Sequence, residues 1–193
     1  MKNIKLIEKE FENEKKVVLE ERYSRVDNNP SALLSEQINA ALYMNHPYKK
    51  PIIGWEHEIK NLNLGDVTKF YKKYYAPNNA IIVICGDVNL DEVVKIAKKY
   101  FGVIKPSKID KRSWTLEPTQ HAPRKITLNS KDTAIPVFKR HYLVPTYTKS
   151  KKESLTLEVF SEILGNPSTG MLFEEFVKNK KLATSASAYY YPD

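Results

Sequence analysis

The sequence has 193 residues, of which 41% are hydrophobic and 28% charged, proportions typical of a globular domain. These values exclude a collagen-like fibre or a low-complexity linker, and no apolar run approaches the ~20 residues that a membrane span requires. The formal net charge is +8, which would suit an anionic partner. The lysine pairs are scattered, however, and are not interleaved with aromatic residues, so we expect neither nucleic-acid nor membrane binding.

Apolar residues recur at helical spacing through much of the first half of the chain. Acidic residues fill the start of the first such segment and basic residues follow, which suits the helix macrodipole. Asn63-Leu64-Gly65-Asp66 has the pattern of a capping box, and Asn89 is placed to cap a later helix. The helices predicted for this part of the chain are 7–25, 31–44, 64–75 and 90–100.

The best candidate for a strand is the apolar, β-branched run from Ala80 to Gly86, which we expect to be buried on both faces. Cys85 lies inside this run and is therefore expected to be a small buried side chain. Strands are also predicted at 125–129, 134–144 and 182–191, and helices at 151–164 and 171–179. The expected fold class is α+β, with antiparallel sheet layers and helices packed on them.

Residues 105–124 are proline-containing and lack a periodic apolar face, as is typical of a linker. They separate two unequal parts, residues 1–104 and residues 125–193. We expect this linker to be the most protease-sensitive segment of the chain.

Histidines are few, and none of them completes a zinc-binding motif. His57 lies in two incomplete zinc-binding motifs. The first histidine of H-x-x-E-H is absent from residues 53–57, and the second histidine of H-E-x-x-H is absent from residues 57–61. We therefore expect His57 to be an exposed loop residue and His46, before Pro47, to be a turn residue. Nothing places His121 or His141 near a partner.

Glu14 and Glu21 lie seven residues apart in a predicted helix, which places them ~20° from each other on one face and about 10 Å apart along the axis. Two such carboxylates can ligate a metal or orient a water molecule. They can equally be solvated, or pair with Lys15 and Arg25. Spacing alone does not decide between these readings.

An ordered set of short motifs resembles the pitrilysin/insulinase family of zinc peptidases, in particular its bacterial members similar to the mitochondrial processing peptidase. These motifs are 14–22 (EKKVVLEER), 27–30 (DNNP), 46–48 (HPY), 51–54 (PIIG), 77–80 (PNNA), 86–88 (GDV) and 100–102 (YFG). Residues 163–165 and 182–191 resemble the opening of the second homologous domain of that family. The similarity covers nearly the whole chain.

The resemblance implies the family's metalloprotease fold and a site in which two histidines of H-x-x-E-H and a later glutamate bind Zn²⁺. By the pattern E-x-x-V-x-L-x-E, Glu21 corresponds to the third zinc ligand and Glu14 to a supporting acid. The H-x-x-E-H motif is absent from this sequence. We therefore expect an internal fragment of a zinc metalloendopeptidase, with 1–104 as the end of its first domain and 125–193 as the start of its second.

From this we expect that the chain alone neither holds zinc nor cleaves peptides, whereas its parent would act on peptides or unfolded proteins. A non-catalytic paired subunit and a basic binding or scaffold module remain alternatives. Uncovered sheet edges and an apolar helix face would favour self-association. The compartment, bacterial cytoplasm or periplasm, is left open.

Overall fold

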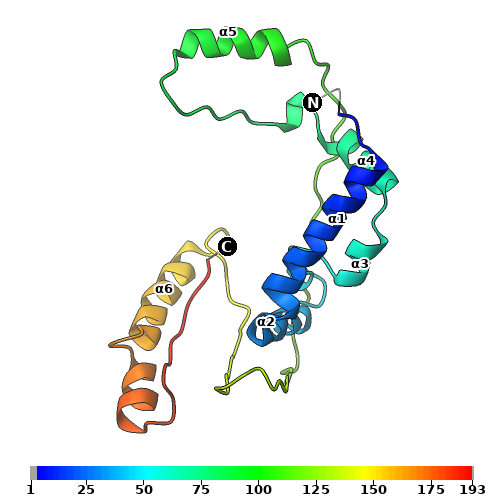
Figure 1. The fold of residues 1–193 in the computed structure, drawn as a ribbon. Coiled ribbons are helices and arrows are strands. Elements are labelled where there is room, and N and C mark those ends of the chain that lie inside the picture. The colour runs from blue at the N-terminus through cyan, green and yellow to red at the C-terminus, as the bar shows by residue number, and fades with distance from the viewer. Residues whose placement is uncertain (1–3, 193) are drawn as a thin grey trace. The chain divides into compact units, whose positions relative to one another are not determined.

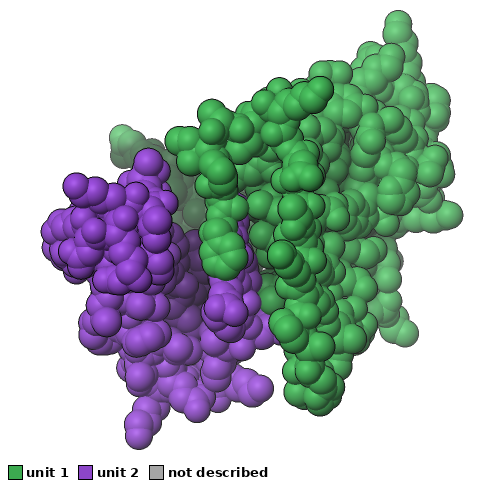
Figure 2. Space-filling view, turned by 90° about the horizontal axis from the view of Figure 1, so that it is seen from below, with its two compact units in different colours: residues 1–138 green, residues 139–193 purple. Residues whose placement is uncertain are grey.

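The structure, a computed structural model, describes residues 4–192. Contacts divide the chain into two compact units, residues 1–138 and residues 139–193, which Figure 2 colours separately. The boundary follows Phe138 and so does not coincide with the linker expected at residues 105–124. The assignment of the chain to parts of two homologous domains stays a prediction.

The first unit contains five α-helices among its described residues (Figure 1). They are α1 (Glu8–Arg22), α2 (Pro30–Leu42), α3 (Glu56–Asn61), α4 (Leu64–Tyr74) and α5 (Leu90–Phe101). A π-helix, η1 (Tyr23–Asp27), continues α1, and two 3₁₀ turns, η2 (Pro47–Lys49) and η3 (Pro77–Asn79), lie in the loops. Helix α1 packs against α3, and α2 packs against η1 and η2.

The helix starts follow from local capping. Asn29 accepts hydrogen bonds from the backbone N–H groups of Ser31 and Ala32, with Pro30 at the first helical position of α2. The capping box predicted at Asn63 and Asp66 is confirmed, because each side chain accepts from the other's backbone N–H. Asn89 caps α5 as predicted. These starts are set by residues within one turn, so the sequence identifies them.

The second unit contains α6 (Lys151–Gly165) and a π-helix, η4 (Phe173–Asn179). The Tyr190 hydroxyl donates to the carbonyl of Pro145 and is within 2.8 Å of the Ser154 hydroxyl, which ties the C-terminal segment to α6. The backbone of Ala188 also approaches Gly165 and donates to its carbonyl. The buried Ser154 lies at this contact.

The predicted α+β fold class is wrong for this structure: residues 4–192 form helices and irregular segments and contain no β-strand. The runs expected to be strands, 80–86, 125–129, 134–144 and 182–191, have no ladder partner. A strand is stabilised by hydrogen bonds to a neighbouring strand, and a β-branched pattern fixes only the local preference. The expected burial of Cys85 is wrong for the same reason, since the thiol lies in an exposed segment.

Apolar burial is small throughout the described residues. Only Ile59 and Ala76 are buried hydrophobic side chains, whereas Arg22, Glu36 and Ser154 are buried polar ones. The first unit is therefore organised around a buried ion pair as much as around an apolar core. Among these residues, no helix is both long and apolar enough to cross a bilayer.

Candidate functional site

Glu14 and Glu21, the two residues singled out by the sequence, both lie within the regular helix α1. Their seven-residue spacing keeps them on one face of that helix. The Glu21 carboxylate is 3.0 Å from the guanidinium of Arg25, one turn later, and the two side chains are 42% and 74% exposed. The side chain of Glu14 is exposed and makes no hydrogen bond or ion pair within the described part of the chain.

The zinc site implied by the resemblance is not assembled by residues 4–192. No group of three or more histidine, cysteine, aspartate or glutamate side chains comes together there. His57 lies exposed on α3, and His46 caps η2 through its imidazole Nδ1. A catalytic zinc ion needs about three protein ligands, and this chain offers a single carboxylate at Glu21. The donor set therefore does not fit a zinc ion by itself.

Arg22, the neighbour of Glu21, is the centre of a buried network that sequence reasoning missed. Its Nη1 donates to the carboxylate of Glu36 at 2.9 Å and to the carbonyl of Gly54 at 2.8 Å. Its Nη2 donates to Asp27 at 3.0 Å and to the second oxygen of Glu36 at 3.2 Å. The hydrogen bonding that Arg22 donates to the Glu36 carboxylate is the main reason why the pKa of Arg22 is raised. One guanidinium thus joins α1, η1, α2 and the loop before α3.

The π-helix explains how Arg22 reaches Asp27. In η1 the backbone bonds run between residues five apart rather than four, which brings positions 22 and 27 onto the same side. Gly54 has a φ of +89°, a left-handed conformation that a residue with a Cβ adopts only with strain. Gly54 adopts this conformation in the turn where its carbonyl accepts the hydrogen bond from the Arg22 guanidinium.

A second polar cluster lies beside this network. The Tyr23 hydroxyl donates to the Glu56 carboxylate at 2.8 Å, and Lys60 also bonds to Glu56. The bonds from Lys60 and Tyr23 lower the pKa of Glu56, and the bond to Glu56 raises the pKa of Tyr23. The cluster holds α3 against the end of α1, on which Glu21 lies.

Glu117 forms another unpredicted contact, at the end of α2. Its carboxylate accepts hydrogen bonds from the backbone N–H groups of Met44, Asn45 and His46, at 2.7, 2.9 and 2.8 Å. Partial burial opposes its ionisation, but the three N–H groups and the charge of Arg124 outweigh that effect and lower the pKa of Glu117. Part of the expected linker is therefore docked on the loop that follows α2, within the first unit.

Further bonds from the same segment reach the carbonyls of α2 and the loop after it. Thr115 donates to Asn45, and Gln120 and Arg124 donate to the last carbonyls of α2, which otherwise have no partner within the helix. Residues 115–124 thus cap the C-terminal end of α2. No local pattern in the sequence signals this, because the partners lie some seventy residues away.

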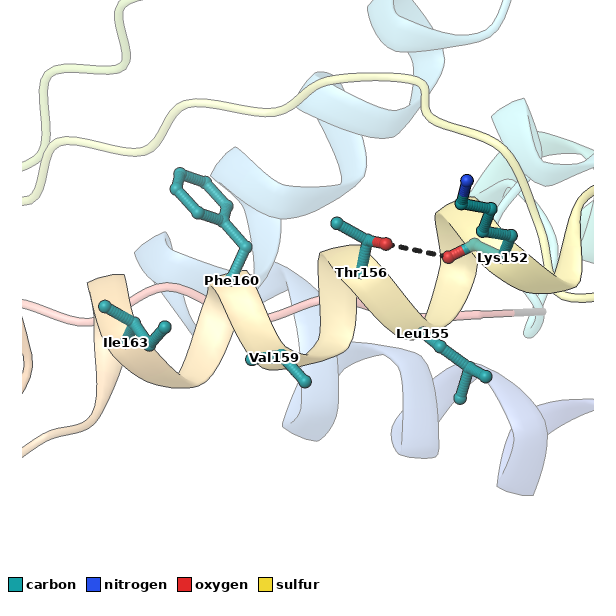
Figure 3. Close-up of a pocket in the computed structure, with 6 residues that line it drawn as sticks. All are labelled: Lys152, Leu155, Thr156, Val159, Phe160 and Ile163. Atoms are coloured by element: carbon teal, nitrogen blue, oxygen red, sulfur yellow. Dashed lines mark hydrogen bonds between the residues drawn. The ribbon is translucent and has the colours of Figure 1, made fainter.

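The second unit carries an open groove of about 580 Å³ along α6. Figure 3 shows its lining side chains projecting from this one helix. They are Lys152, Leu155, Thr156, Val159, Phe160 and Ile163. The only side-chain hydrogen bond given among these six residues is the one that the Thr156 hydroxyl donates to the Lys152 carbonyl, within the helix. The groove has no converging polar groups and is an exposed apolar face rather than a catalytic site.

A smaller cavity of about 250 Å³ lies in the first unit, between the turn after η1 and residues 128–132. It is lined mainly by polar side chains, among them Asp27 and Asp132. One carboxylate oxygen of Asp27 is buried there without a hydrogen-bond partner, while the other accepts from Arg22.

Comparison with known proteins identifies the family. A family model described as the peptidase M16 inactive domain matches residues 61–193. Zinc protease PqqE of Helicobacter pylori is 33% identical over 193 residues, which cover 98% of this chain and 43% of that protein. An uncharacterized zinc protease of Mycobacterium leprae is 27% identical over 183 residues, an alignment that covers 91% of this chain and 39% of that protein.

A solved structure is also similar. The crystal structure of a protease from Helicobacter pylori aligns with a TM-score of 0.70 and 32% identity, over 98% of this chain and 46% of that one. A probable mitochondrial-processing peptidase subunit beta of Schizosaccharomyces pombe is 32% identical over half of this chain. The chain spans less than half the length of each of these relatives.

The resemblance stated from the motifs is confirmed by these matches. Relatives that bear the name zinc protease align from the α1 motif to the C-terminal segment, and the family model covers more than half of the residues. The chain therefore belongs to the peptidase M16 family, the pitrilysin/insulinase group of zinc peptidases.

Proposed function

We propose that this chain acts as part of a zinc metalloendopeptidase, to which Glu21 contributes the third zinc ligand and Glu14 a supporting carboxylate. Residues 1–104 would form the end of the first peptidase domain and residues 125–193 the start of the second. The observation that carries the proposal is the placement of Glu21. Its carboxylate is accessible on a regular helix, whose end is fixed by the buried guanidinium of the next residue.

The present partner of Glu21 does not prevent such a role. The pair with Arg25 is solvent-exposed on both sides, and exposed pairs contribute about 1 kcal/mol or less. A zinc ion bound by histidines would therefore compete easily for this carboxylate. When bound, such an ion activates water and polarises a peptide carbonyl. The residues of this chain would contribute a carboxylate to it, held on a helix whose end is fixed by Arg22.

We expect the chain to be inactive on its own, because it supplies too few zinc ligands. With one carboxylate and no histidine pair, residues 1–193 should neither hold zinc at a stoichiometric level nor cleave a peptide bond. The substrates of the longer polypeptide would be peptides or unfolded proteins. This rests on the relatives, which are named as proteases.

The experiment is a zinc measurement on the polypeptide encoded by the complete reading frame, with residues 1–193 measured in parallel. Zinc per chain is determined after dialysis for the wild type and for Glu21→Gln, Glu14→Gln and Glu20→Gln. Glu20 is the matched control, because it undergoes the same change one position away and points about 100° from Glu21. Loss of zinc in Glu21→Gln, with retention in Glu20→Gln, supports the proposal.

Two results would contradict it. One is a Glu21→Gln polypeptide that keeps its zinc with unchanged affinity. The other is one tightly bound zinc ion per chain in residues 1–193 alone. A complete polypeptide without any zinc would favour the paired, non-catalytic subunit.

A further inference from the structure

The guanidinium of Arg22 is held by three different elements of the first unit. It donates two hydrogen bonds to Glu36 in the middle of α2, one to Asp27 in η1 and one to the carbonyl of Gly54 in the loop before α3. The side chains of Arg22 and Glu36 are only 5% and 6% exposed. A planar guanidinium bound by several partners cannot turn without breaking hydrogen bonds. The network therefore restricts how the last turn of α1, which ends at Arg22, can rotate or slide.

Two uncommon backbone features bring these partners together. The π-helix η1 places Asp27 beside Arg22, and such π-helical turns are rare and occur frequently at functional sites. Gly54 has a φ of +89°, a conformation that favours glycine, where its carbonyl accepts from the guanidinium. Stability alone does not require the charges, because a buried ion pair can often be replaced by apolar side chains of similar size without loss. These features favour a role in geometry.

The direction of Glu21, which directly precedes Arg22, depends on that geometry. Side-chain tips lie about 5–6 Å from the axis of an α-helix, so a rotation of the α1 end by about 10° would move the Glu21 carboxylate by about 1 Å. Groups at a working site have to be held within about 0.5 Å. The pair of Glu21 with Arg25 is exposed on both sides and is too weak to fix the carboxylate to that tolerance.

We infer that Arg22 and Glu36 are positioning residues for Glu21, because together they set the direction in which the Glu21 carboxylate points. This inference rests on the proposed function, in which Glu21 is a zinc ligand. Neither positioning residue is itself a candidate ligand. The guanidinium is a cation, and both carboxylate oxygens of Glu36 accept hydrogen bonds from it.

A positioning role and a purely structural role predict different zinc affinities. When the loss of a contact only makes the fold less stable, the apparent dissociation constant changes with the folded fraction, and it stays the same while nearly all chains are folded. When the contact orients a ligand, the folded protein itself binds the metal more weakly. Partners that orient metal ligands typically contribute about 10- to 100-fold to metal affinity.

The test is the zinc dissociation constant of the polypeptide encoded by the complete reading frame, measured by competition with a chelator under conditions in which each variant is folded. Glu36→Gln removes the charge that holds Arg22 and should weaken zinc binding about tenfold or more. Arg22→Met/Glu36→Leu leaves no unpaired carboxylate at position 36 and should also bind zinc at least about tenfold more weakly, although it regains part of its stability. Urea unfolding curves give the folded fraction of each protein.

Glu56→Gln is the matched control. It makes the same change in a carboxylate that accepts from Tyr23, the residue after Arg22, and that is 41% exposed. The amide oxygen of glutamine can still accept this hydrogen bond, and the exposed pair with Lys60 contributes little, so the dissociation constant should change by less than about twofold.

Glu21→Gln, measured in parallel, separates the two proposals. If this variant keeps its zinc with unchanged affinity, or if the wild type binds none, the zinc proposal and the positioning role are both overturned. If Glu21→Gln loses zinc while folded Glu36→Gln and the folded double variant bind it as the wild type does, only the positioning role is overturned. Equal weakening by Glu36→Gln and Glu56→Gln would also overturn that role, because the effect would then not depend on Arg22.

Discussion

Arg22 and Glu36 are joined by two hydrogen bonds, of 2.9 and 3.2 Å, with side chains only 5% and 6% exposed. The pair connects the last residue of α1 with the middle of α2. Because Glu21 immediately precedes Arg22, the same contact fixes the end of the helix that carries the candidate zinc ligand. The stability of the first unit and the position of its candidate site therefore depend on one ion pair.

Arg22→Met should destabilise the first unit by about 3–5 kcal/mol, because it leaves the buried Glu36 carboxylate without its partner. The measurement is the free energy of unfolding by urea. Arg25→Met is the control: it removes an exposed partner of Glu21 and should change that free energy by about 1 kcal/mol or less. Equal effects of the two substitutions would show that the buried pair has no special role.

The double variant Arg22→Met/Glu36→Leu should recover the part of the lost stability that comes from the unpaired Glu36 carboxylate, whereas Asp27 and the Gly54 carbonyl stay without the guanidinium. Replacing both members of a buried ion pair by apolar groups of similar size is often close to neutral. A double variant as unstable as the sum of its single changes would contradict the assignment of the loss to an unpaired carboxylate.

Gly165→Ala should destabilise the second unit by about 2 kcal/mol or more, because the added Cβ would lie 2.5 Å from the Cα of Ala188 and still closer to its backbone nitrogen. Neither backbone can move without breaking the contact of the C-terminal segment with α6. Hydrogen exchange of the α6 amides measures the effect. Unchanged exchange of the α6 amides in Gly165→Ala would refute the packing argument.

Glu117→Gln should weaken the docking of residues 115–124 at neutral pH. The carboxylate accepts hydrogen bonds from backbone N–H groups, whereas the NH₂ group of glutamine is itself a donor and would face those N–H groups without bonding to them. Because the pKa of Glu117 is lowered in the folded state, its stabilisation is present above its ordinary value and is lost as the pH falls through the lower folded value.

The difference in unfolding free energy between wild type and Glu117→Gln should therefore shrink between neutral pH and about pH 3. Urea titrations at several pH values measure it. A difference that stays constant over this range would mean that the charge of Glu117 does not contribute.

Limited trypsin digestion should cut first after Lys108, Lys111 or Arg112 and later after Arg124. The guanidinium of Arg124 donates to carbonyls at the end of α2, whereas residues 108 and 111–112 are exposed and irregular. The linker expected from the sequence thus separates into residues 107–112, whose contacts with Asn78 and Lys73 are exposed, and residues 115–124, which are docked on the end of α2. First cleavage after Arg124 would contradict the docking.

The features predictable from the sequence are those determined within a few residues. The predicted Asn63 and Asn89 caps lie one position before their helices, and so α4 and α5 begin where the pattern places them. Helix α2 begins one residue before its predicted start, at Pro30, with a cap at Asn29 that was not predicted. The strand predictions failed because a strand requires a partner that the local pattern does not specify. Cys85 was assigned to a core for the same reason.

The roles of Glu21 as a zinc ligand and of Glu14 as a supporting acid stay predictions, made from their spacing and the family motif. The Arg22 network could not be predicted from the sequence, since its partners lie 5 to 32 residues away and one is brought close by a π-helix. Arg22, Asp27 and Gly54 do lie within the motifs that resemble the family. The motifs therefore contain all three residues, but a motif does not show which of its residues contact one another in the folded chain.

The most direct test of the account is anomalous scattering at the zinc edge from crystals of the polypeptide encoded by the complete reading frame. The account predicts a zinc peak about 2.0–2.2 Å from a carboxylate oxygen of Glu21, with Arg25 displaced from that oxygen. A zinc peak remote from α1, with Glu21 still paired to Arg25, would contradict it.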